Sequence, residues 1–61
     1  MKLRVIREEK GIRQRDLAAK LKMSQAYLSN LEAGKVNVSL YTLRRLAKAL
    51  KVRVVDLLAD E

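Results

Sequence analysis

Residues 14–33 of this 61-residue chain, QRDLAAKLKMSQAYLSNLEA, decide its fold. They contain two short segments whose apolar residues recur every three or four positions, as they do along one face of a helix. The first segment begins near Gln14, and the second follows Ser24, a residue type that favours a helix N-cap. Only a few residues separate the segments, and Ala18 offers a small side chain where two backbones could approach. This spacing predicts a helix-turn-helix, with residues 21–23 as the turn.

The apolar residues divide these two helices into an inner and an outer face. The inner stripes consist of Leu17, Leu21, Met23, Leu28 and Leu31. The opposite face of the second helix then holds short side chains without charge, namely Gln25, Ala26, Tyr27, Ser29 and Asn30. Gln and Asn amides can both donate and accept at the N6 and N7 edge of adenine, and an Ala methyl can touch a thymine methyl. We therefore predict that this face reads DNA bases.

The residues on either side of the motif also predict helices. A first helix over roughly residues 2–10 ends at Gly11, where a left-handed C-cap is expected. Gly34 ends the third helix, Ser39 caps a fourth, and a short last helix covers roughly residues 54–59. The inward stripe of the fourth helix is expected to be Leu40, Leu43, Leu46, Ala47 and Leu50. We predict an all-α fold of five helices in a single domain over residues 1–61.

Composition restricts the classes of function. The chain has no Cys and no His, so it lacks thiolate metal ligands, the commonest zinc ligand and the usual general base. We predict that the protein is not an enzyme and needs neither a cofactor nor a metal. Lys and Arg number 14 against 7 acidic residues, a net charge of +7 that is typical of proteins meeting a polyanion. We see no signal peptide or membrane span and expect a cytoplasmic protein without membrane contact.

Together these motifs resemble the lambda-repressor-like, Cro/C1-type helix-turn-helix family, also called the XRE family. The resemblance covers essentially the whole chain, from residues 3–11 as the first helix, through 24–34 as the recognition helix, to 39–52 as the fourth. It implies five helices, insertion of the third helix into the major groove of double-stranded DNA, and a homodimer on a palindromic operator. It further implies regulation of transcription, and residues 26–29 and 37–40 are similar to controller proteins of restriction-modification systems.

The resemblance also implies roles for individual residues. Gln25, Ala26 and Asn30 should face base edges, with Tyr27 and Ser29 on the flank. Phosphate contact is implied in the same way for Gln14, Lys35 and Asn37, with the helix N-terminus near Ser39 beside them. Gln14 should in addition steady the first base-reading side chain. Arg7 and Glu32 should form a salt bridge between the first and third helices, a bridge that fixes orientation more than it adds stability. Beyond the resemblance, the net positive charge predicts phosphate contact for Arg13 and Arg15, and the hydroxyl or backbone N–H predicts it for Ser24.

Four residues depart from the family pattern. Lys22 occupies a turn position where the family commonly has Gly, and a left-handed Lys there costs on the order of 1 kcal/mol. Arg13 replaces the usual Ser or Thr cap of the second helix, which forgoes an N-cap bond of about 1 kcal/mol. Arg53 stands where a cap commonly precedes the last helix, and Val38 replaces a frequent Pro.

Three alternatives stay open at this point. The last segment holds more apolar side chains than one short terminal helix can bury in so small a chain, and we predict a two-fold dimer interface from Val52, Val54, Val55 and Leu58. These side chains could instead complete the core of a monomer. Tyr27 could be a half-buried spacer against the second helix. Finally, an antitoxin-like protein-interaction module of a toxin-antitoxin pair is a competing function for such a fold.

Overall fold

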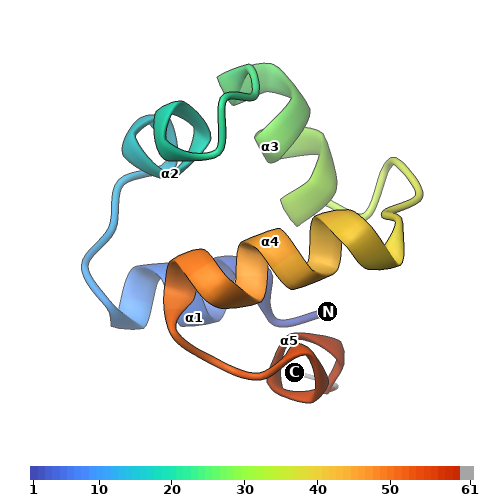
Figure 1. Ribbon diagram of the computed structural model, residues 1–61. Helices are drawn as coiled ribbons and strands as arrows, with labels where there is room; N and C mark the ends of the chain where they lie inside the picture. The colour runs from blue at the N-terminus through green and yellow to red at the C-terminus, as the bar shows by residue number, and fades with distance from the viewer. Residues whose placement is uncertain (60–61) are drawn as a thin grey trace.

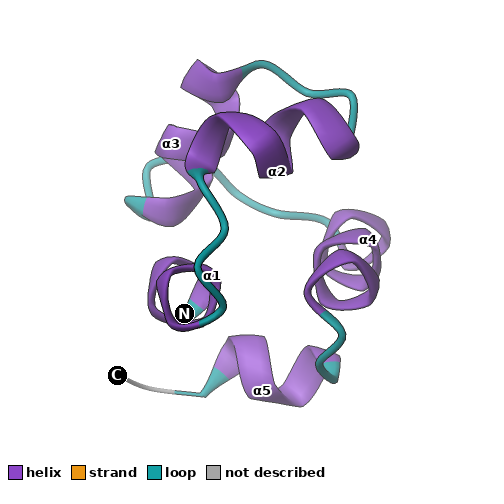
Figure 2. Cartoon of the chain, turned by 90° about the vertical axis from the view of Figure 1, so that its left-hand side faces the viewer, coloured by secondary structure: helices purple, strands orange, loops and turns teal. Residues whose placement is uncertain are grey.

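The computed structural model describes residues 1–59, which form five α-helices and no strand (Figure 1). The helices are α1 (Leu3–Glu9), α2 (Gln14–Lys20), α3 (Gln25–Glu32), α4 (Leu40–Leu50) and α5 (Val54–Leu58). Every helix predicted from the sequence is present, and the all-α fold with α2 and α3 as the helix-turn-helix is confirmed. Both views place α2 and α3 together at one end of the molecule and α5 at the opposite end (Figures 1 and 2).

The core is a single cluster of aliphatic side chains to which all five helices contribute. Its buried members are Leu3, Ile6, Leu17, Ala18, Leu21, Leu28, Leu31, Leu43, Leu46, Ala47, Leu50 and Leu57. Leu40 was predicted on the inward stripe of α4, but its side chain is 56% exposed. It is the first residue of α4, and the exposure places it beyond the part of the helix that the core covers. In α5, Leu57 is buried in the core, whereas its neighbour Leu58 is 53% exposed.

Local chemistry explains where the helices begin. The Ser24 hydroxyl accepts a hydrogen bond from the Tyr27 backbone N–H at 3.0 Å, and the Ser39 hydroxyl accepts one from the Thr42 N–H at 3.1 Å. Both serines are therefore the N-caps that the sequence predicted. Arg13 makes no side-chain cap bond, also as predicted. Arg53 stands where a cap is common before α5, and there the Asp56 side chain contributes the capping bond instead. Its carboxylate accepts a hydrogen bond from the Arg53 backbone N–H at 2.9 Å.

Positive backbone φ angles mark the turns that close the helices. Gly11 and Gly34 have φ of 69° and 73°, which Gly adopts at little cost. Lys22, which stands where the family commonly has Gly, has the left-handed conformation, with φ of 56°. Lys51 adopts the same conformation with φ of 58° after α4, which the sequence analysis did not predict. Each Lys holds a conformation that costs about 1–2 kcal/mol for a residue with a Cβ.

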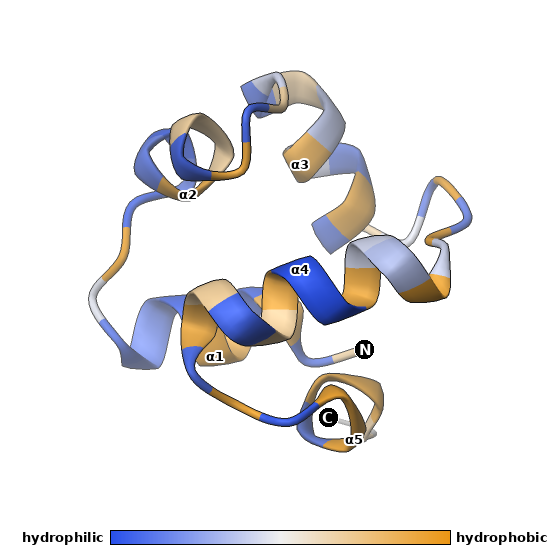
Figure 3. Ribbon diagram, in the orientation of Figure 1, coloured by the Kyte–Doolittle hydropathy of each residue, from blue (hydrophilic) through white to orange (hydrophobic). Residues whose placement is uncertain are grey.

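Hydropathy separates α5 from the rest of the molecule. Figure 3 shows α5 as mostly apolar, whereas α2 and α4 alternate between hydrophilic and hydrophobic residues. The Lys2 backbone N–H donates to the Leu57 carbonyl at 2.8 Å, which ties the start of the chain to α5. No helix of the described part of the chain is long and apolar enough to cross a membrane.

Candidate nucleic-acid interface

The predicted base-reading residues lie together on α3. Leu28 and Leu31 anchor this helix in the core, so the residues between them and before them turn outward. Positions 25 and 29, and likewise 26 and 30, are one helical turn apart, which makes these four side chains a compact patch. Gln25, Ala26 and Asn30 are exposed, Ser29 is half-buried at the edge, and Tyr27 is 39% exposed. The patch carries no charge of its own.

A chain of hydrogen bonds connects this patch to a buried ion pair. The Gln25 Nε2 donates to the Gln14 Oε1 at 3.2 Å, and the Gln14 Nε2 donates to the Glu32 Oε1 at 3.0 Å. An ionised carboxylate only accepts hydrogen bonds, so Gln14 must turn its NH₂ toward Glu32 and its oxygen toward Gln25. Gln25 then donates one N–H to Gln14, and its amide oxygen and its other N–H can still bind another partner.

The ion pair at the base of this chain joins α1 to α3. The Arg7 guanidinium donates to Glu32 through Nε at 2.6 Å and through Nη2 at 3.2 Å. Its Nη1 donates to the Ile12 carbonyl at 2.7 Å, and the Arg4 Nε lies 3.4 Å from the Glu32 carboxylate. The Glu32 side chain is fully shielded from solvent, and Arg7 as a whole is only 8% exposed. Glu32 thus joins α1, α2 and α3 through its bonds with Arg7 and Gln14.

Burial by itself would raise the pKa of Glu32, because a carboxylate is less stable away from water. Hydrogen bonds from Arg7 and Gln14 and the positive charge of Arg7 outweigh burial, so the pKa of Glu32 lies below its ordinary value. The hydrogen bond between Arg7 and Glu32 raises the pKa of Arg7 above its ordinary value, although burial alone would lower it. Glu32 is therefore ionised at neutral pH, which fixes the direction of the Gln14 amide.

The predicted phosphate-contacting residues flank the base-reading patch at both ends. Arg13, Gln14 and Arg15 lie at the start of α2, and the Gln14–Gln25 bond brings that end of α2 beside the start of α3. At the far end of α3, the Lys35 N–H donates to the Asn30 carbonyl at 2.9 Å. The loop 35–39 with its predicted residues therefore begins where the patch ends. Six of the seven predicted side chains are exposed and Gln14 is half-buried.

Besides Gln14, the side chains of Arg13, Ser24 and Ser39 also have partners within the chain. The Arg13 Nε lies 2.8 Å from the Asp16 carboxylate in an exposed ion pair, which a phosphate could replace at little cost. The Ser39 hydroxyl donates to the Thr42 Oγ1 at 3.0 Å while it caps α4. By contrast, the Ser24 hydroxyl is fixed by the bond that it accepts and keeps its own proton for a partner.

Sequence reasoning missed several contacts around the motif. Arg4 lies three residues before Arg7 on α1, and that spacing alone could have predicted that both approach Glu32. The Arg45 guanidinium donates to the Leu21 carbonyl at the end of α2, a contact between distant helices that leaves no signal in the sequence.

The predicted dimer residues divide into two groups. Val52 and Val54 are half-buried and pack against the core. Val55 and Leu58 are 60% and 53% exposed, and their spacing of three positions puts them on one side of α5. The structure thus brings two of the four side chains to the surface.

Comparison with known proteins agrees with this arrangement. Residues 3–57 match the family model described as Helix-turn-helix. The HTH-type transcriptional regulator DdrOP3 of Deinococcus deserti is 46% identical over 57 residues, covering 93% of this chain and 44% of the relative. The immunity repressor protein of Bacillus phage phi105 is 35% identical over 60 residues, covering 98% of this chain and 42% of the relative. Control protein C.MunI of a Mycoplasma species is also 35% identical over 60 residues, covering 97% and 81%.

The chain therefore spans less than half the length of the first two of these relatives. No solved structure is a significant match. The family model nevertheless covers α1 to α4 completely and α5 as far as Leu57. The relatives are named as a transcriptional regulator, an immunity repressor and a control protein. This chain belongs to the Cro/C1-type helix-turn-helix family of transcriptional regulators, a DNA-binding class and not a class of enzymes.

Proposed function

We propose that this protein regulates transcription, as a repressor or a controller, by inserting α3 into the major groove of a specific operator. The observation that carries the proposal is the chain of bonds from the buried Glu32 through Gln14 to Gln25. An exposed amide normally samples many rotamers, whereas the Gln25 amide is held in a defined direction by its bond to Gln14. Gln25 lies at the start of the exposed face of α3. A side chain fixed in this way loses less conformational entropy when it binds a base.

In this mechanism the uncharged patch reads sequence and its surroundings supply affinity. Gln25 and Asn30 would pair with base edges, and Ala26 would approach a thymine methyl. Tyr27 and Ser29 would contact bases or sugars at the flank. The exposed residues at both ends of α3, with Arg13, Arg15 and Lys35 as the cations, would neutralise phosphates and position the helix. Their contribution would be the same for every sequence and would weaken with salt.

The proposal includes a homodimer that forms through α5. Val55 and Leu58 offer an exposed apolar surface on a helix that Figure 3 shows as mostly apolar. Because α5 lies at the end of the molecule opposite to α2 and α3, a partner docked there would leave α3 uncovered (Figures 1 and 2). A two-fold dimer presents two α3 helices to a palindrome whose half-sites are about 34 Å apart, one turn of DNA. Such a regulator would act in the cytoplasm, as the sequence analysis predicts.

Selection of duplexes from a random DNA pool with the full chain tests this function, followed by affinity measurements of the winners across salt concentrations. We expect a palindrome whose half-sites lie about one helical turn apart, with affinity well above that for random DNA. Binding without any enriched sequence and with only a steep salt dependence would contradict base reading by α3. That result would favour a protein partner, as in an antitoxin-like module.

A further inference from the structure

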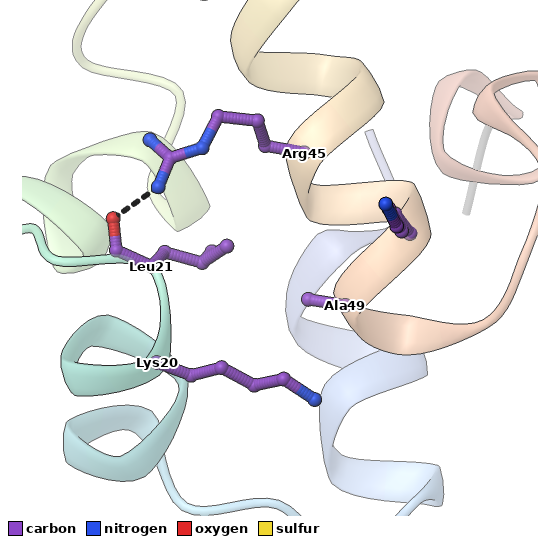
Figure 4. A pocket seen from close by; sticks show the side chains of 5 residues that line it. Lys20, Leu21, Arg45 and Ala49 are labelled. Atoms are coloured by element: carbon purple, nitrogen blue, oxygen red, sulfur yellow. Dashed lines mark hydrogen bonds between the residues drawn. The ribbon is translucent and has the colours of Figure 1, made fainter.

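A cavity of about 390 Å³ lies between the end of α2 and the second half of α4 (Figure 4). Lys20 and Leu21 line it from α2, and Arg45, Lys48 and Ala49 line it from α4. Its volume falls in the range of about 300–1,000 Å³ that is usual for small-molecule sites. The base-reading patch plays no part in it, because no residue of α3 is among its lining residues.

The polar side chains that line this cavity are all cations. Lys20 lines it from α2, Arg45 and Lys48 line it from α4, and no acidic side chain is among the lining residues. Within residues 1–59, the ion pairs of this chain involve none of these three cations. Three like charges around one cavity repel each other, and an anion between them would relieve that repulsion.

Arg45 is already oriented for such an anion. Its guanidinium donates to the Leu21 carbonyl, and its Cζ lies 5.9 Å from the centroid of the Tyr41 ring. Figure 4 shows the Arg45 side chain reaching from α4 to α2, and Lys20 extending from α2 into the gap. The Leu21 carbonyl occupies one edge of the guanidinium, so its remaining N–H donors are available in fixed positions. A planar, pre-positioned fork of donors suits phosphate oxygens.

We infer that this cavity binds a small organic phosphate ester. A phosphate dianion matches a cavity lined by three cations better than a single carboxylate does, and Leu21 and Ala49 supply an apolar surface for the ester group. The end of α2 carries roughly half a negative charge from its helix dipole, and the three full positive charges outweigh it. The site is separate from the proposed DNA-reading surface and does not depend on it.

Phenyl phosphate is a suitable probe, because it combines a phosphate dianion with a compact apolar group. It is added to the DNA-free full chain at fixed ionic strength, with chloride replaced in equal measure, and the amide signals are followed by NMR. We expect saturable shifts centred on residues 20–21 and 45–49, with inorganic phosphate binding at the same residues more weakly. Shifts that do not saturate, or shifts centred on residues 24–30, would overturn the inference.

Two substitutions on α4 separate a site from a general charge effect. Lys48→Gln and Arg44→Gln each remove one exposed positive charge from the same helix, but only Lys48 lines the cavity. Lys48→Gln should raise the Kd for phenyl phosphate by about threefold to fivefold, the upper range for an exposed charge pair. Arg44→Gln should leave the Kd unchanged. Equal effects of the two substitutions would refute the site.

A third arm distinguishes a small molecule from the DNA backbone as the source of phosphate. A short duplex is added in place of phenyl phosphate, and the same amides are followed. Shifts at residues 20–21 and 45–49 with DNA, combined with none with phenyl phosphate, would mean that the cavity contacts DNA, and this would overturn the inference. Saturable shifts with phenyl phosphate would support the inference whether or not the duplex binds α3. The test of the cavity is therefore independent of the test of the proposed function.

Discussion

Replacing Glu32 by Gln tests whether the buried ion pair supports both the fold and the interface. The Glu32 carboxylate accepts two hydrogen bonds from Arg7, at 2.6 and 3.2 Å, and one from Gln14 at 3.0 Å. The amide that Glu32→Gln introduces would offer one oxygen to these donors and turn its NH₂ toward another of them. It would also leave the charge of Arg7 without a counterion in a position that is 8% exposed.

Breaking a buried pair from one side costs about 3–5 kcal/mol, because the remaining charge stays buried without compensation. Arg4 lies at the rim of this pair and water can reach the Arg7 edge, so we place the loss for Glu32→Gln at the lower end, about 3 kcal/mol. Small domains have a total free energy of unfolding of about 5–15 kcal/mol, so the loss is large. Replacing both partners, as Arg7→Met with Glu32→Leu, should recover most of it.

Urea denaturation followed by circular dichroism measures this loss, with Glu9→Gln as an exposed control expected to change stability by less than about 0.5 kcal/mol. The pH dependence gives a second check. The pKa of Glu32 in the folded protein lies below its ordinary value of 4.5, so the ionised carboxylate stabilises the fold above that pH. This contribution disappears as the pH falls through the folded pKa. The difference in free energy of unfolding between wild type and Glu32→Gln should therefore become smaller below about pH 4.5. A difference under about 1 kcal/mol at neutral pH, or a difference that does not change with pH, would refute the reasoning.

Three further substitutions test separate parts of the account. Lys22→Gly should raise the free energy of unfolding by about 0.5 kcal/mol, because relief of the left-handed strain exceeds the entropy that Gly adds to the unfolded chain. A lower free energy of unfolding in urea denaturation would show instead that the Lys22 side chain makes stabilising contacts. Ser39→Ala should lower it by about 1 kcal/mol through loss of the α4 cap, whereas no change would mean that water replaces the hydroxyl. Val55→Asp should convert the proposed dimer to a folded monomer in sedimentation velocity, and an unchanged assembly state would remove α5 from the interface.

Local rules explain which parts of the fold could be predicted. The caps at Ser24 and Ser39 depend on a few neighbouring residues, and both predictions are confirmed. The departure from Gly at Lys22 pointed to a turn position, and the structure shows that Lys22 is left-handed there. Leu40 could not be placed, because its spacing fits the inward stripe and only the packing of the other helices determines where coverage ends. Lys51 was missed because no Gly marks the end of α4. The Val52 N–H bonds to the Ala47 carbonyl, and the turn that this bond closes holds Lys51 in the left-handed region.

The candidate site follows the same division. Helical spacing was enough to predict one face on α3 for the base-reading residues. The direction of the Gln14 amide requires the carboxylate of Glu32 beside it, a contact across 18 positions. Likewise, the cavity beside Arg45 depends on the distance between α2 and α4, which no local pattern encodes.

The most direct test of base reading by α3 compares Gln25→Ala with Lys35→Ala on two duplexes, the selected operator and a random sequence. Gln25→Ala should lose about 1–3 kcal/mol of binding free energy on the operator and little on random DNA. Lys35→Ala should weaken binding to both duplexes about equally and reduce the slope of log affinity against log salt by about one. If Gln25→Ala instead weakened both duplexes equally, Gln25 would not read bases, and the central claim would fail.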